Sequence, residues 1–377
     1  MKEKLQQYLY KLLDLNGSDL HLKAGSAVHM RVNGELLSVG EEVLSNKDIL
    51  EIAKTMLTSE QHNKLMDTKE LDYSYELEKE NRFRVNFFYQ VNGLSIVLRV
   101  IPERILSLEE LNLPEIVKKI SDLNHGLVLV TGTSGSGKST TMAAIIDRIN
   151  KLKRKHIVSI EDPIEYLHKE DKCLISQRSV GINTLSFTNA LKSALREDID
   201  VIFIGELRDL ETVEIALHAA NTGHLVVSTL HTLDAKDTIT RMIGMFPKEE
   251  QPRIRMTLSF LLEGVISQRL VGTKGNKRIA AIEVMVKTKR ISELISESRD
   301  SEILEAIIKG KDVYGTQSFD QALFELFRRG IIEKTVALRN ATNPSDMSLK
   351  LQGIGDSDRH EEMSGEKKKR RNVFDLK

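Results

Sequence analysis

The segment with the most specific chemistry is a glycine-rich stretch that follows an apolar run. Residues 132–139 read GTSGSGKS, a complete GxxxxGKS pattern. Glycines let backbone N–H groups turn inward around phosphate oxygens, and the positive end of a following helix adds to the attraction. Lys138 can reach the terminal phosphates of a nucleoside triphosphate, and the Ser139 hydroxyl can bind Mg²⁺. We therefore predict a phosphate-binding loop made of Ser134, Gly135, Ser136, Gly137, Lys138, Ser139 and Thr140.

A first acidic pair follows the apolar run at residues 157–160. If this run is a strand of a parallel sheet, Glu161 and Asp162 leave it at the carboxyl edge, where ligands bind in such sheets. A carboxylate there can hold Mg²⁺ through its waters or orient an attacking water. Capping of a helix is the alternative, and for Asp162, directly before Pro163, it explains the residue as well as catalysis does.

A second acidic strand end follows residues 201–204 and reads Gly205-Glu206. The aspartate that usually follows such a strand is replaced by Gly205. Glu206 must then orient the attacking water and help to hold Mg²⁺ without that aspartate.

Two histidines flank the apolar run at residues 225–230. Taken alone, His224 and His231 are more often structural than catalytic. Their seven-residue spacing does not match a helical zinc pair, which argues against a metal site. Beside a phosphate loop, they become candidates for sensing phosphate or water.

Three arginines lie on predicted strands of the N-terminal part. Arg82 and Arg84 share one face of their strand, and Arg99 lies on the next strand. A solvated basic face is the ordinary explanation for such residues. Phosphoryl transfer also needs cations that offset transition-state charge, and a second subunit can supply them. The sequence leaves both explanations open.

These residues require elements that position them, and the first hundred residues predict a small α+β domain. Helical spacing of apolar residues predicts an opening helix, and Asn33-Gly34 predicts a hairpin turn. We further expect a helix at residues 48–66 and strands at residues 19–22, 82–87 and 96–101. The domain is expected to end near residue 103.

From about residue 120, apolar strands alternate with amphipathic helices, which predicts a parallel α/β sheet. We expect strands at residues 127–130, 157–160, 201–204 and 225–227, and helices at residues 187–195 and 210–222, the second with Asp209 as its N-cap. From residue 251 the chain is expected to be mostly helical. The predicted domains are residues 1–103 and 104–352, followed by a disordered tail at 353–377 that contains the basic run at 367–371.

Composition narrows the class of protein. The 377 residues include 55 Lys+Arg and 55 Asp+Glu, so the net charge is zero, which argues against bulk nucleic acid as the main partner. The single cysteine, Cys173, excludes an internal disulfide and a cysteine-rich zinc cluster. No apolar run approaches the roughly 18 residues that span a bilayer, and the N-terminus does not read as a secretory leader. We expect a cytoplasmic protein.

Together the motifs resemble those of the secretion ATPase superfamily and, within it, the pilus retraction motors of the PilT/PilU type. The resemblance runs from about residue 16 to 350 and includes the phosphate loop. Its other markers are SDLHL at 18–22, RFRVN at 82–86, IEDPIE at 160–165 (the Asp box), GELRD at 205–209 (an atypical Walker B motif) and TGHL to LHT at 222–232 (the His box).

The resemblance implies roles for these residues. Glu206 would be the catalytic glutamate and Glu161 an acid near Mg²⁺, with His224 and His231 as the His-box pair. Arg82, Arg84 and Arg99 would reach a neighbour's nucleotide. The implied fold is α/β: a PAS-like α+β N-terminal domain followed by a RecA-like P-loop ATPase domain with a parallel sheet.

The resemblance also implies cofactors and partners. ATP and Mg²⁺ would bind, and six copies of the chain would form a homohexameric ring that drives pilus retraction and twitching motility. The ring would act in the cytoplasm, peripherally associated with the inner membrane at the pilus base. Its partners would be an inner-membrane platform protein and a paralogous retraction ATPase, and no nucleic acid is expected.

One stretch departs from the family pattern. The retraction signature reads AIRNLIRE, whereas residues 290–297 read RISELISE. The apolar positions and the last glutamate are kept, but both arginines are replaced, by Ser292 and Ser296. This favours an accessory or divergent motor, as PilU-type paralogues are. Two alternatives from other classes remain at this point: a RecA-like nucleic-acid translocase, and an ATP-binding assembly module that does not hydrolyse ATP.

Overall fold

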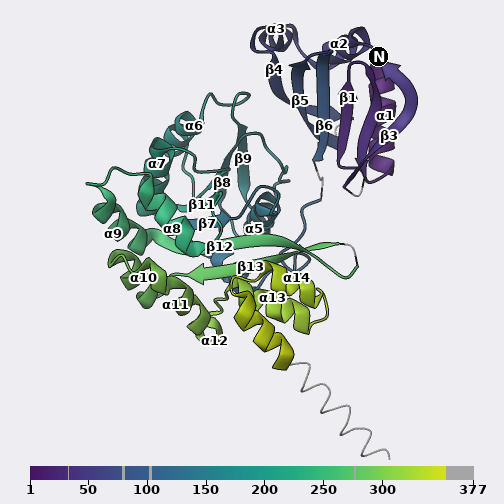
Figure 1. Cartoon of the computed structure of the whole chain (residues 1–377). Helices are drawn as coiled ribbons and strands as arrows, with labels where there is room; N and C mark the ends of the chain where they lie inside the picture. The colour runs from purple at the N-terminus through teal and green to yellow at the C-terminus, as the bar shows by residue number, and fades with distance from the viewer. Residues whose placement is uncertain (33, 79–80, 102–103, 276, 354–377) are drawn as a thin grey trace, which may run out of the picture. The chain divides into compact units, whose positions relative to one another are not determined.

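The computed structural model describes the whole chain except residues 33, 79–80, 102–103, 276 and 354–377. The described residues form two compact units (Figure 1). Unit 1 comprises Met1–Ile105 and Glu161–His168, and unit 2 comprises Leu106–Ile160 and Lys169–Lys377. The domain boundary predicted near residue 103 falls on residues outside the described set, and so does the predicted disordered tail apart from Gly353.

Unit 1 is an antiparallel sheet with helices packed on one face. Among its described residues the strand order is β3-β2-β1-β6-β5-β4. The elements are α1 (Lys2–Asp14), β1 (Asp19–Lys23), β2 (Ser26–Val32), β3 (Glu35–Leu44), α2 (Asn46–Met56), α3 (Ser59–Thr68), β4 (Glu70–Leu77), β5 (Asn81–Gln90) and β6 (Gly93–Ile101).

Alternation along the strands of unit 1 separates a buried face from a polar face. Phe83, Val85 and Phe87 of β5 are fully buried and join the apolar stripe of α1 in one core. The residues between them, Arg82 and Arg84, point to the opposite face because side chains alternate along a strand. The predicted opening helix and strands are present, and β2 pairs with β3 so that Val32 lies opposite Glu35. Asn33 of the predicted turn lies outside the described residues.

The helix predicted over residues 48–66 is two helices, α2 and α3. Leu57 is extended, with φ −102° and ψ 144°, so the helix cannot continue through it. Thr58 then accepts a hydrogen bond from the Gln61 N–H, while the Gln61 side chain accepts one from the Thr58 N–H. This reciprocal cap starts a new helix inside an apolar pattern that reads as continuous.

Unit 2 is a mixed sheet whose described strands run in the order β13-β12-β7-β11-β10-β8-β9. Its strands are β7 (Gly126–Thr131), β8 (His156–Glu161), β9 (Leu174–Ser179), β10 (Val201–Ile204), β11 (Leu225–Leu230), β12 (Leu262–Gly272) and β13 (Arg278–Val286). Its helices are α4 (Glu115–Ser121), α5 (Lys138–Leu152), α6 (Phe187–Ala194), α7 (Leu210–Asn221), α8 (Ala235–Gly244), α9 (Gln251–Leu261), α10 (Lys289–Ser296), η1 (Asp300–Glu302), α11 (Ile303–Lys309), α12 (Lys311–Tyr314), α13 (Phe319–Arg328) and α14 (Lys334–Asn340).

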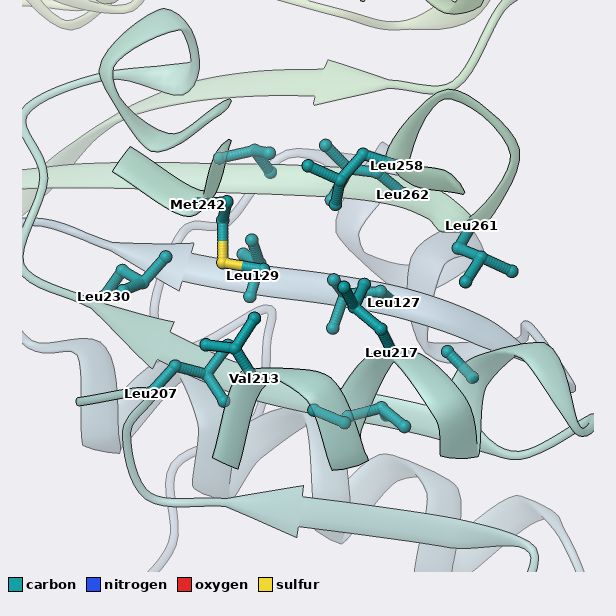
Figure 2. Packing of buried hydrophobic residues seen from close by; sticks show 14 of the residues in the cluster. Leu127, Leu129, Leu207, Val213, Leu217, Leu230, Met242, Leu258, Leu261 and Leu262 are labelled. Atoms are coloured by element: carbon teal, nitrogen blue, oxygen red, sulfur yellow. The ribbon is translucent and has the colours of Figure 1, made fainter. Parts of the chain in front are cut away.

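Helices cover both faces of the unit 2 sheet. Leu127 and Leu129 of β7 belong to the cluster that holds α6 to α9, whereas Val128 and Val130 belong to the cluster that holds α4 and α5. Figure 2 shows Leu127 and Leu129 among labelled side chains of α7, α8 and α9. A strand buried on both faces needs an unbroken apolar run, which is the pattern that predicted β7.

The prediction of mostly helical structure from residue 251 is wrong for residues 262–286. Here β12 and β13 form a long antiparallel hairpin (Figure 1). The helix α9 ends at Leu261 and β12 begins at Leu262, so no turn residue marks the change. The strand forms because β12 pairs in parallel with β7, a long-range contact that local apolar spacing does not reveal.

The α/β class with an α+β N-terminal unit and a largely parallel sheet is confirmed. The strands predicted at residues 127–130, 157–160, 201–204 and 225–227 correspond to β7, β8, β10 and β11. Asp209 caps α7, as predicted, through a 2.9 Å bond from the Thr212 N–H. Within the described part of the chain, no helix has the length and apolar character needed to cross a membrane.

Candidate active site

The phosphate loop joins the end of β7 to the start of α5 in unit 2. Its three glycines have positive φ values: 145° at Gly132, 74° at Gly135 and 91° at Gly137. A Cβ atom at Gly132 would lie 2.5 Å from the Gln268 carbonyl oxygen and from the Ser136 hydroxyl. Both the backbone conformation and the close packing therefore require glycine at position 132.

The helix α5 begins without a side-chain cap. Gly137 is its N-cap residue and offers no side-chain hydrogen bond, whereas Asp209 caps α7 and Asp234 caps α8. The first N–H groups of a helix need partners and carry the positive end of its dipole. The start of α5 is therefore suited to bind an anion, with Ser139 and Thr140 on the same first turn.

The Lys138 ammonium lies inside the loop. The side chain is 8% exposed, and its Nζ donates to the carbonyls of Gly132 at 2.9 Å and Thr133 at 3.0 Å. These bonds hold the charge where phosphate oxygens would enter the cradle.

Glu206 lies between two basic side chains at the end of β10. Arg208 contacts one of its carboxylate oxygens, and Nε2 of His231 lies 3.6 Å from the other. The Glu206 side chain is only 20% exposed, so solvent screens these contacts incompletely. The structure thus brings together the predicted Glu206 and His231, and adds Arg208.

Hydrogen bonds to β11 fix the backbone around Glu206. The Thr229 hydroxyl donates to the Gly205 carbonyl at 2.6 Å, and the Leu207 N–H donates to the Thr229 carbonyl at 3.1 Å. One residue therefore binds the chain on both sides of the glutamate. Sequence reasoning gave no role to Thr229 or Arg208; a hydroxyl inside the apolar run of β11 was the available signal for Thr229.

The charges around Glu206 and the phosphate loop affect the pKa of His231. Burial and then the charge of Lys138 lower the pKa of His231 below its ordinary 6.5; Glu206 opposes this shift and Arg208 adds to it. His231 is therefore mainly neutral near pH 7. Because the charge of Lys138 lowers this pKa, the imidazole at the end of β11 lies within electrostatic reach of the phosphate loop.

Glu161 leaves β8 at the same edge of the sheet as Gly205 leaves β10, because Ile160 pairs with Ile204, whereas His224 lies at the opposite edge. Glu161 is the last residue of β8, is 7% exposed and accepts a bond from the Glu165 N–H at 3.4 Å. His224 precedes β11 at the amino end of that strand, with its ring bonded to the Ala219 carbonyl and the Thr222 hydroxyl. A strand rises about 3.3 Å per residue, so His224 lies roughly 20 Å from His231 and is not part of the cluster around Lys138.

The three arginines lie on the polar face of the unit 1 sheet. Arg84 and Arg99 are directly opposite one another on β5 and β6. Each makes an ion pair within the unit: Arg82 with Glu76 at 3.5 Å, Arg84 with Asp72 at 3.8 Å and Arg99 with Asp19 at 2.7 Å. Their part in a nucleotide site stays a prediction.

The candidate metal ligand on the phosphate loop is the Ser139 hydroxyl. Among the residues that the structure describes, no group of three or more His, Cys, Asp and Glu side chains is placed to bind an ion. Ser139, on the first turn of α5, fits a Mg²⁺ ion that is bound mainly by phosphate oxygens. This matches the donor set of phosphate loops.

Comparison with known proteins identifies relatives over most of the chain. The family model described as "Type II/IV secretion system protein" matches residues 1–318. The chain is 44% identical over 329 residues to the type IV pilus retraction ATPase PilT of Pseudomonas aeruginosa, covering 87% of this chain and 95% of that protein. It is 39% identical over 356 residues to the type IV pilus ATPase PilU of the same organism, covering 94% of this chain and 93% of that one.

A solved structure agrees with the fold. The crystal structure of the pilus retraction motor PilT with bound ADP superposes with a TM-score of 0.84 at 39% identity, covering 90% of this chain and 97% of that one.

The cluster predicts opposite effects of two substitutions on His231. Lys138→Met should raise the pKa of His231 because a nearby positive charge is removed, and Glu206→Gln should lower it because a negative charge is removed. The pKa is measured by NMR titration of the imidazole Cε1–H signal. Lys151→Met is the control: it removes a lysine from the same helix about 20 Å further along, beyond the screening length. Shifts in the same direction, or an equal response to Lys151→Met, would contradict the assigned geometry.

Proposed function

Because the chain belongs to the type II/IV secretion system protein family, we propose that it is an ATP-hydrolysing motor subunit that drives type IV pilus retraction. The observation that carries the proposal is the cluster of Lys138, Glu206 and His231 beside the uncapped start of α5. The names of the relatives support the pilus as the system served, since they are a pilus retraction ATPase and a pilus ATPase.

Nucleotide binding follows from the loop. The N–H groups of the loop and of the first turn of α5 donate to the phosphate oxygens, and the Lys138 ammonium exchanges its two carbonyl partners for the terminal phosphates. The Ser139 hydroxyl would help to hold Mg²⁺, which would offset the charge of the phosphates. The bound ADP in the related retraction motor is consistent with this assignment.

Hydrolysis needs a positioned water. Glu206 accepts a hydrogen bond from the attacking water and orients it toward the terminal phosphate. Arg208 and His231 each face one oxygen of this carboxylate, so its orientation is set before the water arrives. A neutral His231 can donate one hydrogen bond without neutralising the glutamate, which suits a sensor of the terminal phosphate. Roles for Glu161 and His224 are part of the proposal.

We further propose that six copies form a ring in which Arg82, Arg84 and Arg99 reach the nucleotide of a neighbour. Arg84 and Arg99, directly opposite one another on β5 and β6, bring two guanidinium groups together on one face of the sheet, which supports this assignment. The ring would work at the cytoplasmic side of the inner membrane against a platform protein at the pilus base, with a paralogous retraction ATPase as a companion.

Residues 290–297 bear on whether the motor is principal or accessory. They form most of α10, whose Ile291, Leu294 and Ile295 are buried, so the apolar half of the family signature serves packing. The two replaced arginines correspond to Ser292 and Ser296. Because both arginines of the retraction signature are absent, we include an accessory role in the proposal. The two alternatives, a nucleic-acid translocase and a non-hydrolysing module, fit the relatives and the Glu206 cluster less well.

Two substitutions separate binding from hydrolysis. Lys138→Ala should abolish ATP turnover and weaken nucleotide binding, because the loop loses its cation. Glu206→Gln should bind ATP normally but turn over about 10²–10⁴-fold more slowly, because the water loses its carboxylate. Phosphate release and nucleotide binding are measured in parallel, with Lys151→Ala as a control for loss of a lysine from α5. Near-normal turnover in both active-site variants would refute the site.

Mixed rings test the arginines. Subunits carrying Glu206→Gln and subunits carrying Arg84→Ala should each be inactive, yet rings that contain both should recover part of the turnover, since some interfaces receive one intact half from each. Mixing is verified by co-purification of two affinity tags. No recovery in rings shown to be mixed would place Arg84 in a role within its own subunit.

The retraction role is tested in cells. Deletion of the gene should leave pili extended and reduce twitching, and wild-type protein but not Glu206→Gln should restore movement. Surface pili are counted by electron microscopy. A strain that loses its surface pili, and does not regain them when other retraction motors are suppressed, would instead indicate an extension motor.

A further inference from the structure

Gln268, on β12, contacts the phosphate loop through its side chain. Its side chain is 2% exposed, and its Nε2 donates to the Ser136 carbonyl at 3.0 Å. The opposite orientation of the amide would bring two carbonyl-type oxygens together, so the donor must face Ser136. A buried glutamine thus binds the middle of the GxxxxGKS segment although it lies 132 residues further along the chain.

The loop glycines are fitted to this residue. A Cβ atom at Gly132 would lie 2.5 Å from the Gln268 backbone oxygen, and one at Gly137 would lie 3.2 Å from its Nε2. A side chain at Gly132 would therefore collide with Gln268, and one at Gly137 would press against its amide. A second contact lies one residue earlier on β12, where the Ser267 hydroxyl accepts a bond of 2.9 Å from Thr131, the residue before the loop.

Gln268 is not fully satisfied by this contact. In the described part of the chain, its buried Oε1 has no hydrogen-bond partner, and neither does the buried Ser136 hydroxyl. Burying a polar atom without a partner costs free energy that an apolar side chain of the same size would avoid. Packing alone therefore does not explain a glutamine at this position.

Because the peptide bond is planar, the contact between Gln268 and the Ser136 carbonyl also orients the next N–H group. The Ser136 carbonyl and the Gly137 N–H belong to one trans peptide unit, so they point in opposite directions. A carbonyl held toward β12 turns the Gly137 N–H away from β12, toward the interior of the loop. We propose that Gln268 is a positioning residue for phosphate binding, which orients the Gly137 N–H toward the nucleotide by fixing the Ser136 carbonyl; this rests on the nucleotide-binding function proposed above.

The inference is tested by the affinity for ADP with Mg²⁺, measured by calorimetry on the full chain. Gln268→Met keeps the size of the side chain but removes the donor, and should weaken ADP binding about 2- to 12-fold, the range that one neutral hydrogen bond covers. Gln317→Met is the matched control. The Gln317 amide also donates to a backbone carbonyl, that of Ile282 at 2.8 Å, and Ile282 is the cross-strand neighbour of Gln268. This control should leave ADP affinity unchanged.

Gln268→Glu supplies an independent readout. Its ionised carboxylate repels the Ser136 carbonyl and the phosphates, so ADP should bind more weakly than to Gln268→Met at neutral pH. The deficit relative to wild type should shrink as the pH falls, because a protonated carboxyl group can donate to Ser136. A purely structural role would produce no such pH profile.

The outcomes separate the two proposals. If wild type does not bind ADP, the proposed function fails. If wild type binds ADP and both Gln268 variants bind it equally well, the function stands and the positioning role is wrong. The positioning role is also wrong if the Gln268 variants lower the thermal unfolding midpoint without nucleotide but leave the ADP affinity unchanged.

Discussion

The parallel ladder of β7, β11, β10 and β8 fixes the height at which each functional residue leaves the sheet. Thr131 pairs with Leu230, so the phosphate loop and His231 start at the same level. Ile204 pairs with both Ser228 and Ile160, which places the Gly205-Glu206 corner beside β11. A shift of one residue in any of these registers would exchange the two faces of a strand and move the residues that follow it by about 3.3 Å. The apolar clusters on both faces therefore hold the site in register as well as stabilising the unit.

Helices that only support the fold and the helix that begins at the phosphate loop differ in how they are capped. Ser, Thr and Asp side chains cap α2, α3, α6, α7, α8, α10 and α13, where the chain needs a stable start. At α5 the cap residue is Gly137, which offers no side-chain hydrogen bond to the first N–H groups. The local stability lost there is offset by β12, whose Ser267 and Gln268 contact Thr131 and Ser136.

Charge is organised differently in unit 1. Asp19 is 3% exposed; burial raises its pKa, but hydrogen bonds from Ser18 and Arg99 outweigh this and hold the pKa below its ordinary value. Its carboxylate therefore stays ionised and anchors Arg99, while the neighbouring Arg84 faces the same side of the sheet. The polar face of this sheet thus carries arginines whose positions are set by ion pairs within the unit.

The sequence by itself determined the phosphate loop, the two acidic strand ends and the α/β class. These depend on local rules: glycines at positive φ, apolar runs that must be buried on both faces, and acids directly after those runs. It also indicated His231, and it placed His224 at the other end of the same strand. The tertiary structure decided which residues meet.

The sequence assigned no role to Arg208, although it lies within the GELRD stretch, or to Thr229 and Gln268, and β12 was not predicted at all. The reason is that their roles come from strand pairings and hydrogen bonds between residues far apart in the chain, as with Ser136 and Gln268. Local residue spacing does not predict such contacts, because they form only when the sheet has assembled.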